Sequence, residues 1–158
     1  MTLRARGPVT GVLLGLAISG WMLACGGSQT PQDCARGSQC WQEQQRAEIL
    51  QRWAEIRQYR REAHMDLDPA PSDVLQMQSK TVKELKQTCP DNHKEPDSCS
   101  DICSLGHNIC DSAESICRIA DELGKSDDFA QQKCTSAKAS CREAEQRCCD
   151  CANKDAAK

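Results

Sequence analysis

The sequence predicts an all-α protein built around an antiparallel helical hairpin, with helices at about residues 99–123 and 127–152 and one or two helices before them. Cysteines recur at intervals of seven in two sets, which are Cys103, Cys110 and Cys117, and Cys134, Cys141 and Cys148. That interval places each set in a row along one face of a helix. The residue numbers of the pairs 103/148, 110/141 and 117/134 share one sum, 251. Facing positions of an antiparallel hairpin have this property, so a ladder of three disulfides is predicted.

Turn signals lie where the common sum places the turn, between Lys125 and Ser126. Gly124 follows Leu123 as a glycine that ends a helix. Ser126 is the predicted N-cap of the next helix, whose first turn carries acidic residues at 127 and 128, where they complement the helix dipole. The turn chemistry and the cysteine spacing are separate observations, and both predict the same hairpin.

Small side chains accompany the cysteines and allow the two helices to approach closely. Alanines lie three residues beyond a cysteine at Ala113, Ala120, Ala137 and Ala144. Helix axes about 10 Å apart, with Cα atoms at a radius of about 2.3 Å, leave roughly 5.4 Å between facing Cα atoms. Disulfides span about 4.4–6.8 Å between Cα atoms, so the geometry permits the predicted bonds.

The amino terminus predicts export. Arg4 and Arg6 precede an apolar stretch of 14 residues at 11–24, which is shorter than the roughly 20 residues of a membrane span. Residues 1–24 are therefore predicted to be a secretory signal peptide.

The residues around the predicted cleavage site, Met22-Leu23-Ala24-Cys25, resemble the bacterial lipoprotein signal. That resemblance implies that the Cys25 thiol is diacylated and becomes the first residue of the mature chain, anchored in the membrane. No aspartate follows Cys25, which favours the outer membrane of a Gram-negative envelope in that class. An ordinary secretory peptide with a chance cysteine is the alternative.

Composition argues against a conventional single-core enzyme domain. The 134 residues after the signal peptide contain 13 Cys but only 15 Leu, Ile, Val or Phe, or about 11%, and a charged chain below about 20% does not bury enough apolar surface to fold on that alone. Cross-links or metal must therefore contribute. The mature chain has 18 basic and 23 acidic residues, which argues against a nucleic-acid partner. Motifs for phosphate binding, zinc hydrolysis and serine catalysis are missing, so neither an enzyme nor a cofactor is predicted.

Residues 25–39 read as a lipidated tether, and residues 40–88 as an amphipathic helical segment. Ile49, Trp53 and Ile56 form the apolar face of a helix from residue 40 to about 65, and its charged residues form a solvated face. An anion-binding patch of Arg52, Arg57, Arg60 and Arg61 is the alternative for that face. Ser72 is the predicted N-cap of a second helix that runs to about Thr88.

The cysteine-rich hairpin module spans residues 89–158. Ile102, Ile109 and Ile116 form an apolar row beside its cysteines, which needs a partner. The helix at 40–65 is the first candidate, and an external protein is the alternative. Twelve thiols remain when Cys25 is lipidated, and an even number suits an oxidised framework. The residue numbers of Cys99 and Cys151 add up to 250, which differs by one from the common sum, so this pair is a candidate fourth rung. Cys89–Cys149 and Cys34–Cys40 then complete a set of six bonds.

Cysteine rows in a helical bundle also resemble bacterial copper-storage proteins, whose inward thiolates bind Cu(I). Soft thiolates suit Cu(I) and also bind Zn(II). The corresponding ligand set here is Cys103, His107, Cys110, Cys141 and Cys148. That class relies on cysteines spaced by four, of which this chain has one pair, Cys99 and Cys103. Disulfides are therefore the first interpretation and metal binding the second.

Residues 99–151 also resemble cysteine-rich lipoproteins of myxobacterial type, a resemblance that implies architecture and no activity. The sequence as a whole predicts a non-enzymatic, lipid-anchored envelope protein with a disulfide-stabilised structural or interaction module. Its predicted contacts are the membrane, through the lipid, and a protein partner.

Overall fold

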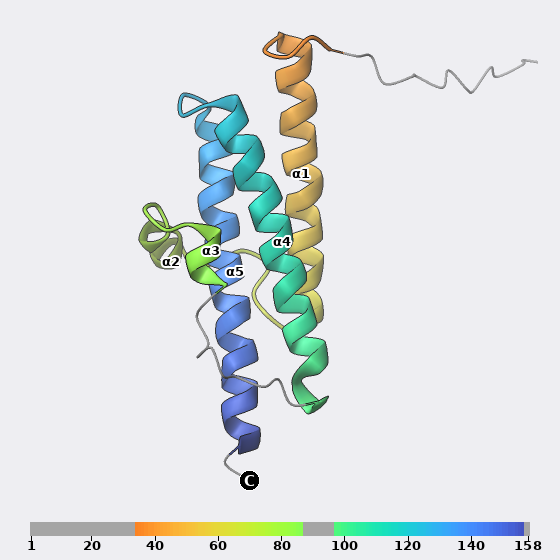
Figure 1. Cartoon of the computed structure of the whole chain (residues 1–158), viewed down its shortest axis with the longest axis vertical. Coiled ribbons are helices and arrows are strands. Elements are labelled where there is room, and N and C mark those ends of the chain that lie inside the picture. Colours follow the sequence, from red (N-terminus) through yellow and green to blue (C-terminus); the bar gives the residue numbers. More distant parts are fainter. Residues whose placement is uncertain (1–33, 87–96, 157–158) are drawn as a thin grey trace, which may run out of the picture. The chain divides into compact units, whose positions relative to one another are not determined.

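The structure, a computed structural model, describes residues 34–86 and 97–156, and every regular element in these ranges is helical (Figure 1). The helices are α1 (Gln39–Glu62), α2 (Pro71–Gln76), α3 (Val82–Leu85), α4 (Ser100–Leu123) and α5 (Asp128–Ala156), with a short 3₁₀ helix, η1 (Asp97–Cys99), before α4. The two long helices α4 and α5 pack against each other along their length. The predicted all-α fold with an antiparallel helical hairpin is confirmed.

The hairpin turn forms at the predicted place with one difference in its cap. Gly124 has φ +93°, which a residue with a Cβ rarely adopts, and its N–H donates to the carbonyl of Ala120. The N-cap of α5 is Asp127, not Ser126 as predicted, and its Oδ1 accepts from the N–H of Ala130 at 3.0 Å. Either side chain can cap a helix, but Asp127 is buried and has a second partner, described below.

Helix α1 covers the apolar row of α4, as predicted. Ser38 caps its first turn through the N–H of Trp41. Ile49, Trp53 and Ile56 are buried in one core with Ile109, Ile116 and Ile119 of α4. Lys133 of α5 places its Nζ 4.8 Å from the centroid of the Trp53 ring, a cation–π distance. The chain therefore supplies its own cover for Ile109 and Ile116, whereas Ile102 at the start of this row is only partly buried.

The predicted single helix from Ser72 to Thr88 is wrong, because the structure has two short helices there. Pro71 occupies the first position of α2, and the capping residue is Ala70. A new helix starts at Val82, because the Thr81 hydroxyl accepts from the N–H of Glu84 while the Glu84 carboxylate accepts from the N–H of Thr81. Such a capping box marks the start of a helix, so the predicted helix is interrupted before Val82.

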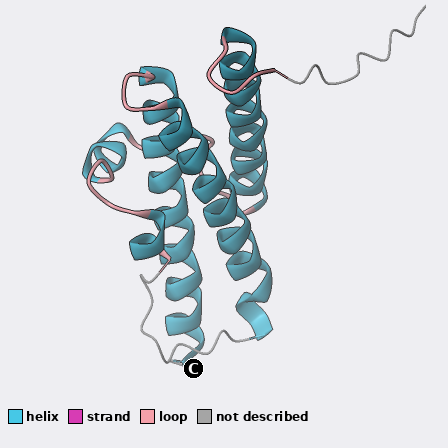
Figure 2. Cartoon of the chain, turned by 45° about the horizontal axis from the view of Figure 1, so that its top comes forward, coloured by secondary structure: helices cyan, strands magenta, loops and turns pink. Residues whose placement is uncertain are grey.

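The two short helices lie against the hairpin on the α5 side, whereas α1 lies on the α4 side (Figures 1 and 2). Met77, Val82 and Leu85 are buried in the same core as α1, but Leu75 is 67% exposed and does not continue the predicted stripe. The hairpin is thus covered on two sides by the segment that precedes it.

Across 34–86 and 97–156, no helix is both long and apolar enough to cross a bilayer. The predicted signal peptide and the predicted lipidation site, Cys25, lie outside the described residues.

Candidate functional site

The three predicted rungs are present in the hairpin. The bonds are Cys103–Cys148, Cys110–Cys141 and Cys117–Cys134, with Cα–Cα distances of 4.7, 4.6 and 4.6 Å. These distances are shorter than the expected value of about 5.4 Å, and the small residues explain the difference. Ala113 and Ala137 are fully buried between the helices, and a Cβ on Gly106 would lie 3.4 Å from the carbonyl oxygen of Ala144. The backbones therefore approach more closely than two average helices.

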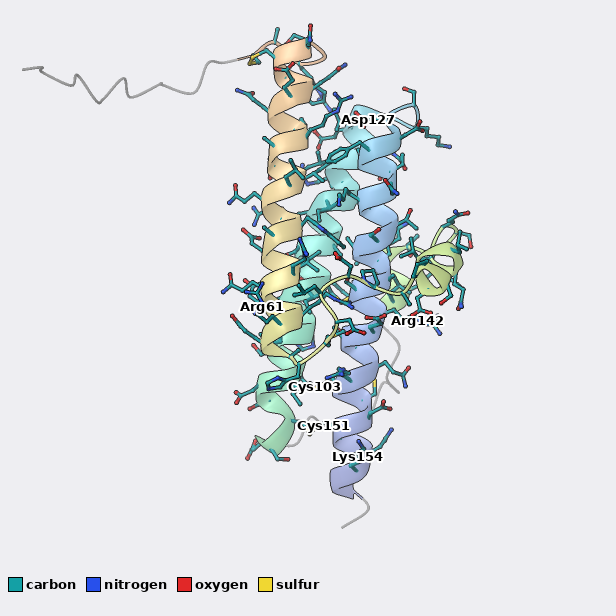
Figure 3. The ribbon with its side chains drawn as sticks, turned by 180° about the vertical axis from the view of Figure 1, so that it is seen from behind. Arg61, Cys103, Asp127, Arg142, Cys151 and Lys154 are labelled. Atoms are coloured by element: carbon teal, nitrogen blue, oxygen red, sulfur yellow. A yellow bond between two sulfur atoms is a disulfide. The ribbon has the colours of Figure 1, made fainter. Side chains whose placement is uncertain are left out.

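Further disulfides close the ends. Cys99–Cys151 adds a fourth rung at the open end of the hairpin, with a Cα–Cα distance of 5.9 Å. Cys34–Cys40 joins the loop before α1 to its first turn. Cys149 is also disulfide-bonded, and its predicted partner, Cys89, lies outside the described residues. Figure 3 shows Cys103 and Cys151 near one end of the hairpin and Asp127 at the other.

The alternative metal ligands do not form a site. Cys103, Cys110, Cys141 and Cys148 are all bonded to other cysteines, so they offer no thiolate to a soft cation. His107 is exposed, whereas Cys103 and Cys110 on the same helix are fully buried. Among residues 34–86 and 97–156 no group of three or more His, Cys, Asp or Glu side chains is placed to hold a metal ion.

A cavity of about 370 Å³ lies where the end of α1 and the chain up to α2 meet α5. Arg60 lines it and is 1% exposed. Its Nε donates to the carbonyl of Asp66 at 2.6 Å, and its Nη1 lies 2.7 Å from Oε2 of Glu143, in an ion pair without a well-aligned hydrogen bond. Arg142, labelled in Figure 3, lines the same cavity from α5. Arg60 therefore joins α1, the following segment and α5, and is not part of an exposed arginine patch.

A second ion pair joins α1 to the hairpin turn. Arg46 places Nε 3.0 Å and Nη2 2.9 Å from Oδ2 of Asp127. The carboxylate thus caps α5 with one oxygen and binds α1 with the other. The residue that caps α5 is in this way also a tertiary contact.

A larger cavity, of about 700 Å³, lies over the α4–α5 groove beside α3. It is lined by the Cys117–Cys134 disulfide and by charged side chains from four segments, which are the loop before α1, α3, α4 and α5. Lys138 lines it from α5, and partial burial lowers the pKa of this ammonium below its ordinary value. Glu114 of the lining is bound by Lys86, the C-cap of α3, which also binds Asp111, and the hydrogen bond to Asp111 raises the pKa of Lys86.

Three of these residues were not singled out from the sequence as contact residues: Arg60, Asp127 and Lys138. Arg60 lies four residues after Ile56 and seven after Trp53, a spacing that places it on the buried face of α1. Lys138 follows Cys134 by four residues on α5, which places it beside a rung. Helical spacing therefore indicated the positions of Arg60 and Lys138, but not the contact made by Asp127.

Comparison with protein families, with curated proteins and with solved structures finds no match to this chain.

Proposed function

We propose that the chain is a lipid-anchored protein of the bacterial cell envelope whose disulfide-laddered bundle is a non-enzymatic structural or interaction module. The observation that carries this proposal is the pairing of cysteines along the hairpin. Every cysteine in the described ranges is disulfide-bonded, and such frameworks persist in oxidising compartments.

The amino-terminal pattern supports the anchoring part of the proposal. An exported chain that begins at a diacylated Cys25 holds firmly to a membrane, because two acyl chains anchor a protein stably where one does so only marginally. The residues from 26 to 33 then separate the lipid from the bundle. The outer membrane is the proposed destination, since no aspartate follows Cys25.

Peptide mapping without reduction tests the framework. Protein purified from the envelope and digested after blocking of free thiols is expected to yield the linked pairs 103–148, 110–141, 117–134 and 99–151, together with 34–40 and 89–149. Free thiols at the ladder positions with stoichiometric Cu(I) or Zn(II) would contradict the proposal and favour the metal-binding alternative.

Fractionation tests the anchor. A Cys25→Ser variant is expected to carry no acyl chains, because serine offers no thiol for acylation. It should appear either in the soluble fraction or, where cleavage also fails, in the membrane as an uncleaved precursor of higher mass. The wild-type chain is expected to carry a mass increment of two or three acyl chains on the peptide that begins at Cys25. An unchanged distribution and an unmodified Cys25 would refute lipid anchoring and leave the disulfide framework as a separate result. Cys34→Ser combined with Cys40→Ser is the matched control, which should remain membrane-bound.

A further inference from the structure

Access distinguishes one rung of the ladder from its neighbours. The Cys117–Cys134 bond lines the cavity of about 700 Å³ over the α4–α5 groove. Cys117 is half-buried, whereas Cys103, Cys110 and Cys141 in the next two rungs are fully buried and do not line it. Thiol–disulfide exchange requires a thiolate to reach a sulfur atom, so access alone separates this rung from the two below it.

The residues that line the cavity carry one net positive charge. The basic residues are Arg36, Lys83, Arg118 and Lys138, and the acidic residues are Glu114, Asp121 and Glu122. Arg118 is paired with Glu122 at 2.8 Å, and Glu114 shares Lys86 with Asp111. Asp121 and Glu84 both interact electrostatically with Lys138. Positively charged walls raise the local concentration of anions, so an anionic reagent is favoured in this cavity over a cationic one.

One lysine is placed to assist the breaking of this bond. Lys138 follows Cys134 by one helical turn on α5 and lines the same cavity. Residues four apart on a helix are neighbours on one face. A nearby ammonium stabilises a thiolate, which makes Cys134 the better leaving group. Cys117 is the more exposed of the two residues, which favours attack on its sulfur.

We propose that Cys117–Cys134 is a thiol–disulfide exchange site that reacts with anionic thiols of the glutathione class. The attacking thiolate forms a bond to Sγ of Cys117, the Cys117–Cys134 bond breaks, and Cys134 leaves as a thiolate that then takes a proton from water. A second thiolate attacks the sulfur of the first reagent in the mixed disulfide and releases Cys117. The protein gains two electrons and two protons, and two thiols become one disulfide.

The neighbouring rung makes this reaction local. Cys110–Cys141 lies two helical turns away and remains bonded, and the turn residues Gly124 and Asp127 hold the helix ends independently of sulfur. Helix content is therefore expected to survive the opening of this rung.

Timed reduction followed by alkylation and mass spectrometry tests the order of opening. With glutathione as the probe and the folded mature chain as the substrate, Cys117–Cys134 is expected to open before Cys110–Cys141 and Cys103–Cys148, with the first adduct on Cys117 and the first free thiol on Cys134. Simultaneous opening of the three rungs, or a first adduct on Cys134, would overturn the proposal. Circular dichroism of the same samples distinguishes local opening from general unfolding.

A second experiment tests the charge argument. The rates of reaction with glutathione and with the cationic thiol cysteamine are measured at equal thiolate concentrations. Each rate is divided by the rate at which the same thiol reduces a small neutral disulfide, which corrects for intrinsic reactivity. Glutathione is expected to react at Cys117–Cys134 about threefold faster or more, and the difference should shrink with added salt. Equal corrected rates would contradict the charge argument.

Variants of Lys138 provide the third arm. Lys138→Gln is expected to slow the opening of this rung by about threefold to tenfold, because the departing thiolate loses its cation, while Lys138→Arg keeps the wild-type rate. Lys154→Gln, an exposed position on α5 outside the cavity, is the matched control and should not change the rate. A slow Lys138→Arg variant would assign the effect to packing and refute the positioning role of Lys138.

Discussion

Complete reduction is expected to unfold the bundle. The buried core contains few large apolar side chains, and much of the α4–α5 contact is made of alanine and cysteine, which bury little apolar surface. On the chain-entropy model the innermost rung alone, with a sequence separation of 17, contributes about 3 kcal/mol. The other rungs add less, because the helices are already held together, but small domains have little stability to lose.

The measurement is refolding after unfolding in denaturant with a reductant, followed by dilution into reducing or oxidising buffer and circular dichroism. Only the oxidised sample is expected to regain helix and a cooperative thermal transition. The control is the double variant Cys34→Ala with Cys40→Ala, whose bond closes only a six-residue separation and should leave the helix content of the oxidised chain unchanged. A fully reduced chain with native helicity and an unchanged Tm would contradict the expectation.

Arg60→Ala is expected to lower the free energy of unfolding by about 2–4 kcal/mol, because it removes a buried charged donor from two partners at once. The side chain is 1% exposed and binds the carbonyl of Asp66 and the carboxylate of Glu143. Glu143 is 29% exposed, so water can solvate its carboxylate after the change, which keeps the cost below that of a fully buried unpaired charge. Urea unfolding of the oxidised protein measures the difference.

Arg61→Ala is the matched control, because its side chain is exposed at the adjacent position of α1. A change there is expected to stay within about 0.5 kcal/mol. Arg60→Met preserves much of the volume and should fall between the two variants. If the Arg60→Ala and Arg61→Ala variants have the same unfolding midpoint, the contacts of Arg60 contribute nothing to stability.

The hairpin was predictable because its signals are local and redundant. Cysteine spacing, the sum of residue numbers and the glycine at the turn each depend on a few residues, and each predicts the same register. The cover of the isoleucine row by α1 also followed, since Ile49, Trp53 and Ile56 form a single stripe that needs a partner. These elements required no knowledge of distant contacts.

The break between α2 and α3 and the role of Arg60 were not predicted from the sequence. Thr81 and Glu84 form a capping box that was in the sequence, but the apolar positions on both sides of it suggested one continuous helix. Arg60 was grouped with exposed arginines by charge, although its spacing from Ile56 places it on the buried face. Its partners, Asp66 and Glu143, come from outside α1, so only the tertiary fold identifies the contact.

The equal spacing of the rungs has a consequence for oxidative folding. If the hairpin shifted by one heptad, pairs 103/141 and 110/134 would share the sum 244, or pairs 110/148 and 117/141 would share the sum 258. Either wrong ladder contains two bonds between facing cysteines and leaves two ladder thiols unpaired. In the first of these registers Cys99 would face Ala144, and in the second it would lie beyond the end of α5 at Ala156, whereas in the native register it bonds to Cys151. Only the native register therefore closes all three ladder bonds and the fourth rung, and a chain trapped in a shifted ladder must exchange disulfides before it can close the Cys99–Cys151 bond.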